Sequence, residues 1–98
     1  MKNDLTPEQI ERFAWLAEEL SECIQAVGKI IRFGLNNKNP EEPNHRGNQY
    51  DLECELGDVY KAANLLANMG DLSLQRMMAH AMISPDSEYF HYEENKNQ

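Results

Sequence analysis

A long apolar stripe in the first third of the chain constrains the fold more than any other feature. The stripe follows a helix start, in which Thr6 can cap the helix, proline takes the first helical position and Gln9 can complete a capping box. Beyond this start, apolar residues recur at alternating steps of three and four. They are Ile10, Phe13, Ala17, Leu20, Ile24, Val27 and Ile31. The pattern predicts one long helix that ends near Phe33.

Two further helices are predicted after a loop. Residues 35–47 hold two prolines and four asparagines and show no apolar periodicity, which is typical of a loop. At about 13 residues, this loop is long for a compact bundle, where such loops usually have a function or are mobile. Apolar spacing then predicts a second helix over 48–69, stopped by a glycine, and a shorter third helix over 71–83 that Asp71 caps.

The size of the chain limits the core that it can build. A domain of 98 residues buries only roughly 60 to 65% of its unfolded surface, so association between subunits is a natural way to bury more. We therefore expect an all-α antiparallel helical bundle of two long helices plus a shorter third, completed by homo-oligomerisation. The helical domain is expected to cover residues 1–83. A polar C-terminal arm, partly ordered or frayed, is expected over 84–98.

Charge and cysteine content narrow the partners and the compartment. The formal net charge is −8, so the surface should repel nucleic acid, which we do not expect as a partner. Cys23 and Cys54 lack metal-site spacing and are interpreted as reduced core residues, which implies a reducing compartment. The first residues lack an apolar signal region, and no run approaches the ~18 apolar residues of a membrane span. These features predict a cytoplasmic protein without membrane contact.

Acidic residues form a second ridge on each long helix. At about 100° per residue, the first helix carries a ridge opposite its apolar stripe, in which two glutamates stand among apolar residues. That ridge is Trp15, Glu19, Glu22, Ala26, Lys29, Ile30 and Phe33. The second helix repeats the design with Asp51, Glu55, Asp58, Ala62, Leu65 and Met69. Each helix therefore places two carboxylates one turn apart, on faces that two antiparallel helices can turn toward each other.

The four acids Glu19, Glu22, Glu55 and Asp58 are predicted to bind Mg²⁺, with Mn²⁺ as an alternative ion. Converging carboxylates raise one another's pKa, and a hard divalent cation with oxygen ligands removes that conflict. Such ions neutralise a triphosphate and orient a water for attack on phosphorus. Further substrate contacts are predicted from two aromatic and three basic residues, although packing alone also accounts for the aromatic ones. These residues are Trp15, Phe33, Lys29, Arg32 and, more weakly, Lys61.

The pattern Glu19-x-x-Glu22 followed by Glu55-x-x-Asp58 resembles the all-α nucleoside triphosphate pyrophosphohydrolase superfamily, the MazG-like group. The likeness covers about residues 16–71 and includes the basic and aromatic residues after the first acid pair. It implies a Mg²⁺-dependent enzyme that hydrolyses a nucleoside triphosphate to the monophosphate and pyrophosphate, in the cleaning of the nucleotide pool. It also implies a homodimer or a dimer of dimers. Glu18 matches the first acid of an E-E-x-x-E form and is expected to help activate water.

Three alternatives remain open at the level of sequence. The same fold also serves hydrolases of dUTP or dUDP, and either Asn44 or Asn48 is expected to reach the substrate. A dinuclear iron protein would need helical Glu-x-x-His pairs. The two such pairs, at 42–45 and 88–91, lie at or after prolines and are not predicted to be helical. A non-catalytic helical interaction module would have the same length and acidic surface.

Overall fold

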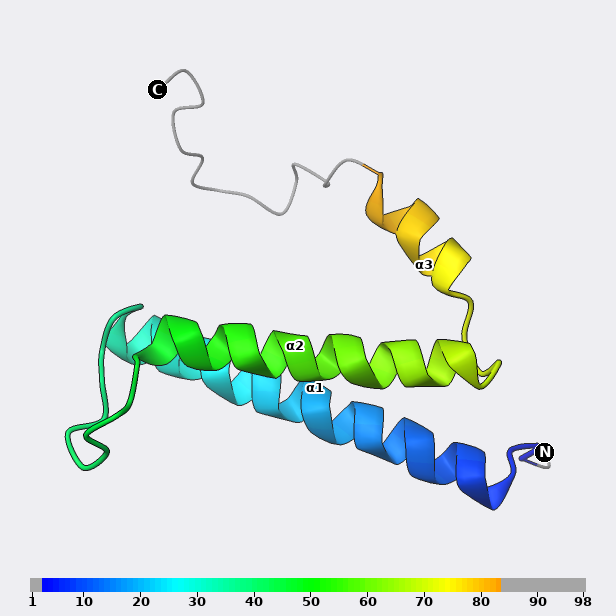
Figure 1. Ribbon diagram of the computed structural model, residues 1–98, viewed down its shortest axis with the longest axis horizontal. Coiled ribbons are helices and arrows are strands. Elements are labelled where there is room, and N and C mark those ends of the chain that lie inside the picture. The colour runs from blue at the N-terminus through cyan, green and yellow to red at the C-terminus, as the bar shows by residue number, and fades with distance from the viewer. Residues whose placement is uncertain (1–2, 84–98) are drawn as a thin grey trace.

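Two long antiparallel helices form the body of the protein (Figure 1). The structure, a computed structural model, describes residues 3–83. Helix α1 spans Pro7–Phe33, α2 spans Asn48–Asn68 and α3 spans Leu74–Ala81. Only α1 and α2 pack extensively against each other within the described range, and α3 leaves the end of α2 at an angle. The prediction of an all-α chain built on two long paired helices is confirmed. The predicted arm over 84–98 lies outside the described residues.

The start of α1 has the predicted capping box. The backbone N–H of Gln9 donates to Thr6 Oγ1 at 3.1 Å, and the backbone N–H of Thr6 donates to Gln9 Oε1 at 2.9 Å. These two bonds satisfy amide groups that a helix end otherwise leaves without partners. The helix ends at Gly34, whose φ of 91° lies in the region that favours glycine. The sequence signals therefore fix both ends of α1.

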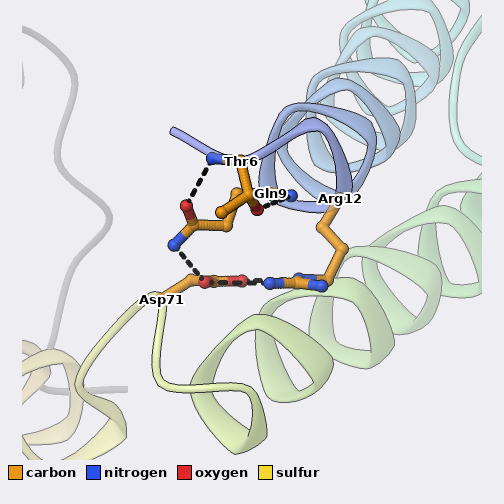
Figure 2. A network of polar contacts seen from close by, with 4 residues as sticks. All are labelled: Thr6, Gln9, Arg12 and Asp71. Atoms are coloured by element: carbon orange, nitrogen blue, oxygen red, sulfur yellow. Dashed lines mark hydrogen bonds and ion pairs between the residues drawn. The ribbon is translucent and has the colours of Figure 1, made fainter. Parts of the chain in front are cut away.

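Asp71 has a different position from the one predicted. Ser73 caps α3 by accepting the backbone N–H of Arg76, whereas Asp71 turns back to the first turns of α1 (Figure 2). Arg12 Nε donates to Asp71 Oδ2 at 2.6 Å, and Gln9 Nε2 donates to Oδ1 at 3.0 Å. Because its side chain is only 1% exposed, an unpaired Asp71 would be costly, and the strong donors of Arg12 outweigh capping. This polar network closes the open end of the hairpin.

Small residues form the centre of the contact between α1 and α2. The buried apolar residues of the described range are Cys23, Ala26, Ala62 and Leu66. Alanine and cysteine allow two helix backbones to approach closely, so the line of contact runs along this narrow seam. Ala26 and Ala62 belong to the acidic ridges as well, so the acids border this seam on one flank of the hairpin, and the apolar stripe of α1 points to the other flank. Leu66 is the largest fully buried side chain.

One flank of the hairpin is an exposed apolar face. It consists of large side chains that are 41% to 79% exposed. They are Ile10, Leu20, Ile24, Val27 and Ile31 of α1 and Leu56 of α2. Periodicity predicted the apolar row correctly, but nothing in the described part of the chain covers it. Cys54 is also exposed, so its interpretation as a core residue is wrong, whereas Cys23 is buried as expected.

The loop between α1 and α2 is attached to the first turn of α2. Backbone N–H groups of Asn48 and Gln49 donate to carbonyl oxygens of Asn37 and Leu35, at 3.1 and 2.8 Å. These bonds give partners to backbone amide groups in the first turn of α2, which would otherwise have none. Both ends of the hairpin are thus held by specific polar contacts. Among the helices of residues 3–83, none has the length and apolar character that crossing a membrane would require.

Candidate metal centre

The acidic flank brings together three of the four predicted ligands. Carboxylate oxygens of Glu19 from α1 and of Glu55 and Asp58 from α2 all lie within 4.8 Å of one another. Glu55 and Asp58 are one turn apart on α2, so both face the same part of α1. All three residues are half-buried, which places their charges in a poorly hydrated part of the surface. The antiparallel pairing proposed from sequence is therefore the one that the helices adopt.

Two oxygens of this cluster are buried without a hydrogen-bond partner. Glu19 Oε2 and Glu55 Oε2 are both shielded from solvent, and no donor within the described residues reaches either atom. A buried carboxylate oxygen without a partner costs free energy, which a cation at the same place would recover. The donor set consists of oxygen atoms alone, which suits a hard ion such as Mg²⁺ rather than a soft one. The residues present thus fit a divalent cation.

Glu22, the fourth predicted ligand, is coupled to this cluster through Glu55. A hydrogen bond between the two carboxyl groups raises the pKa of Glu22 above its ordinary value, and the charge of Glu55 raises it further. Burial and the charges of Glu18 and Asp58 act in the same direction. The neighbouring carboxylates thus disfavour the charged form of Glu22, a penalty that a divalent ion at the cluster would relieve.

Trp15 orients one of the ligands. Its indole Nε1–H donates to Glu19 Oε1 at 3.0 Å, across one turn of α1. The bond fixes the carboxylate so that Oε2 is the oxygen left for the cluster. Sequence alone marked Trp15 as a substrate contact, whereas its contact in the structure is with an acid. An indole four residues before a glutamate was the available signal for this bond.

The remaining predicted residues, Lys61, Arg32, Phe33 and Glu18, are exposed at the surface. Lys61 Nζ is 3.8 Å from Asp58 Oδ1, a weak exposed pair that partly balances the charge of that acid. The guanidinium of Arg32 lies 5.6 Å from the centre of the Phe33 ring, and both side chains are exposed. Glu18 is exposed on α1 and reaches the cluster only through its charge. The structure thus leaves Lys61, Arg32 and Phe33 accessible to a ligand.

A cavity of about 320 Å³, here called the acid cavity, opens beside the cluster. It lies between α1 and α2, and Glu22, Lys29 and Glu55 are among its lining residues together with Asn48 and Asp51. Three acids therefore line the cavity, and Lys29 adds a positive charge. Such a mixture suits an anionic ligand that arrives with its cation, because the lysine and the ion together offset the phosphate charges.

Asp51 and His45 are site residues that the sequence prediction did not include. His45 Nε2 and Asp51 Oδ2 lie 2.6 Å apart, and His45 Nδ1 accepts the backbone N–H of Asn39 at 2.7 Å. Because Nδ1 is an acceptor, the ring carries its proton on Nε2 and donates it to Asp51. Asp51 stands four residues before Glu55 on the same ridge, a signal that sequence offered. The position of His45 depends on the loop fold, for which sequence offered none.

The Glu42-x-x-His45 pair of the iron alternative lies in this loop outside any α-helix, as predicted. Its histidine is bound to Asp51 and to the Asn39 backbone, so both ring nitrogens are engaged. The second pair, at 88–91, lies outside the described residues.

The chain was compared with protein-family models, with curated proteins and with solved structures, and none of these three comparisons finds a match.

Proposed function

We propose that this chain is a divalent-metal-dependent nucleoside triphosphate pyrophosphohydrolase. The observation that carries the proposal is the pair of buried, unpartnered carboxylate oxygens of Glu19 and Glu55 within the three-acid cluster. Structural acids on helices normally find a donor or reach solvent, and among the described residues neither of these two atoms has a donor. An adjoining cavity that contains a lysine supports a phosphate-bearing ligand.

The residues of the site divide the work by position. Glu19, Glu55 and Asp58 would hold Mg²⁺, with Glu22 as the fourth ligand, and Trp15 keeps Glu19 in the orientation that leaves one oxygen free. When bound, Mg²⁺ would supply charge neutralisation of the phosphates and a water of lowered pKa. Lys29 lies on the cavity wall and contributes a second positive charge near the phosphates. For Glu18, which is exposed on α1, a part in activating the water rests on the family resemblance alone.

Product analysis tests the reaction directly. The protein is incubated with Mg²⁺ and a panel of nucleoside triphosphates, and pyrophosphate and orthophosphate are measured separately. Pyrophosphate with a nucleoside monophosphate is expected, because hydrolysis then occurs between the α and β phosphates. Orthophosphate alone would indicate a different phosphatase, and no release with any nucleotide would leave a non-catalytic helical module.

A matched pair of glutamates on α2 tests the site. Glu55→Gln removes a charge from the cluster and should abolish turnover, and Glu53→Gln makes the same change at an exposed position away from it. Both variants should keep the helix content of the parent by circular dichroism. Full activity in Glu55→Gln would show that the cluster is not the catalytic site.

We further propose that a second copy of the chain covers the apolar face. The exposed surface of its six side chains is roughly 650 Å², if a fully exposed large apolar residue has ~200 Å². Two copies related by a two-fold axis would therefore bury about 1,300 Å², within the range of specific interfaces. A second copy is favoured because a two-fold axis places an equally apolar face opposite this one.

The oligomeric state tests this part of the proposal independently of activity. Sedimentation equilibrium should give twice the chain mass of 11.3 kDa. Ile24→Glu, at the middle of the apolar face, should convert the protein to a monomer. A monomeric parent would refute the second copy without touching the metal site on the other flank.

A further inference from the structure

A second cavity continues the acid cavity toward the loop end of the hairpin. This loop cavity has a volume of about 370 Å³ and lies between Phe33 of α1, the loop around Asn37–Pro40 and the first turns of α2. Three of its lining residues, Lys29, Asn48 and Asp51, also line the acid cavity. A ligand that extends along α2 would therefore occupy both spaces. The volume lies within the ordinary range of small-molecule sites.

The loop wall of this cavity is held in place by its own hydrogen bonds. Asn39 is at the centre of these hydrogen bonds. Its backbone N–H donates to His45 Nδ1, and its Nδ2 donates to Glu42 Oε1 at 3.3 Å. Its Oδ1 accepts the backbone N–H of Glu41. The His45 ring is anchored to Asp51 of α2 on its other side. The loop wall is thus connected to α2. A ligand that binds here would therefore lose little free energy in ordering the loop.

Asn48 presents a fixed acceptor at the junction of the two cavities. The residue is only 6% exposed, and its Nδ2 donates to the carbonyl oxygen of Gly34 at 3.0 Å. That bond uses one of the two hydrogens of Nδ2 and sets the orientation of the amide, so Oδ1 is the acceptor that remains for the cavities. Within residues 3–83, Oδ1 accepts no hydrogen bond. One turn further along α2, Asp51 adds carboxylate oxygens, which are acceptors as well.

The spacing along α2 matches the length of a nucleotide. Asn48 precedes Glu55 by seven residues, which corresponds to about 10 Å along the helix axis. A ligand whose phosphates lie at Glu22, Glu55 and Lys29 would bring its base to Asn48 and Asp51. Phe33 borders the same cavity and offers an aromatic ring next to that base.

We propose that the loop cavity receives the base of the nucleotide and selects bases that carry an exocyclic amino group. The inference rests on the proposed pyrophosphohydrolase function and adds its substrate class. Asn48 Oδ1 and the Asp51 oxygen that does not bind His45 need donors from the ligand, and an amino group on cytosine or adenine supplies them. An oxygen at the same ring position, as in uracil or hypoxanthine, would bring lone pairs toward Asn48 Oδ1 and leave that atom without a hydrogen bond.

Pairs of nucleotides that differ only at this group provide the test. Binding of the non-hydrolysable α,β-imido analogues of dCTP and dUTP is measured by calorimetry in Mg²⁺, together with the matching adenine and hypoxanthine nucleotides. The amino member of each pair should bind about tenfold more tightly, as expected for one hydrogen bond gained and one repulsion avoided. Equal binding, or preference for the oxo member, would overturn this inference and leave the proposed function intact. If no nucleotide binds in Mg²⁺, the proposed function fails and the inference fails with it.

A pair of asparagine variants locates the selectivity. Asn48→Ala removes Oδ1 and should reduce the tenfold ratio to about one, while Mg²⁺-dependent binding of both nucleotides persists. Asn36→Ala is the control, because Asn36 is exposed in the same loop and lines neither cavity. The amide of Asn48 also holds Gly34, so thermal unfolding of both variants is measured alongside. A folded Asn48→Ala protein that keeps the parent's ratio would refute the role of Oδ1.

Discussion

Two alanine substitutions distinguish the seam between α1 and α2 from the apolar face. Leu66 is completely buried in the seam, whereas Ile24 is 72% exposed on the apolar face of a single chain. Leu66→Ala should cost about 3 kcal/mol, the usual loss for a buried leucine. For a domain of this size, such a loss lowers the melting temperature by about 12 to 24 °C.

The expected effect of Ile24→Ala depends on what covers the apolar face. In a lone chain only about a quarter of this side chain is buried, so the substitution should cost roughly 0.5 kcal/mol. If a second copy buries the rest, the cost should rise to about 2 kcal/mol. The variant should then also dissociate more readily, so its melting temperature should fall as the protein is diluted.

Thermal unfolding at several protein concentrations measures both effects. Glu53→Ala serves as the control, because an exposed position away from both faces should change stability by less than about 0.5 kcal/mol. A small, concentration-independent effect of Ile24→Ala would show that no second copy covers the face. A similarly small effect of Leu66→Ala would contradict the packing of α1 against α2 itself.

Three further predictions concern the polar contacts. Arg12 lowers the pKa of Asp71, so this acid stabilises the fold at pH values above the ordinary 3.8, and the contribution is lost as the pH falls through the lower folded-state value. Asp71→Asn should therefore lower the melting temperature at neutral pH and flatten the decline of the melting temperature as the pH falls below the ordinary 3.8. An unchanged acid profile would contradict the pairing. Trp15→Phe should weaken Mg²⁺ binding about tenfold by calorimetry, because Glu19 loses the donor that orients it, and unchanged affinity would show that the bond has no such role. His45→Ala should speed hydrogen exchange of the loop amide that donates to the ring, with α1 amides as internal controls; equal protection in parent and variant would show that the ring does not hold the loop.

The helix ends show how far sequence alone predicts this fold. Thr6, Gln9 and Gly34 are local signals, and each acts on its immediate neighbours, so α1 begins and ends where they indicate. Asp71 shows the limit of such signals. Its local context favours a cap, but a partner 59 residues earlier in the chain binds it more strongly. Sequence periodicity does not contain that pairing.

The candidate site was predictable to the extent that it follows from helical angle. Glu19, Glu55 and Asp58 each occupy the ridge that their spacing assigned, and antiparallel pairing of two long helices brings them together. The apolar stripe was equally visible, yet spacing gives the direction of a face and not what lies against it. Asn48 and His45 depend on the path of a loop without periodicity, so their roles required coordinates.

The polar contacts at the two ends of the hairpin have a consequence for the acids between them. Arg12 with Asp71 holds one end, and Asn48 with Gly34 holds the other. These contacts at both ends of the hairpin oppose separation of α1 and α2 when the carboxylates between them repel each other. An ion entering this region would meet ligands already at their places, so little of its affinity would be lost to the entropy of gathering them.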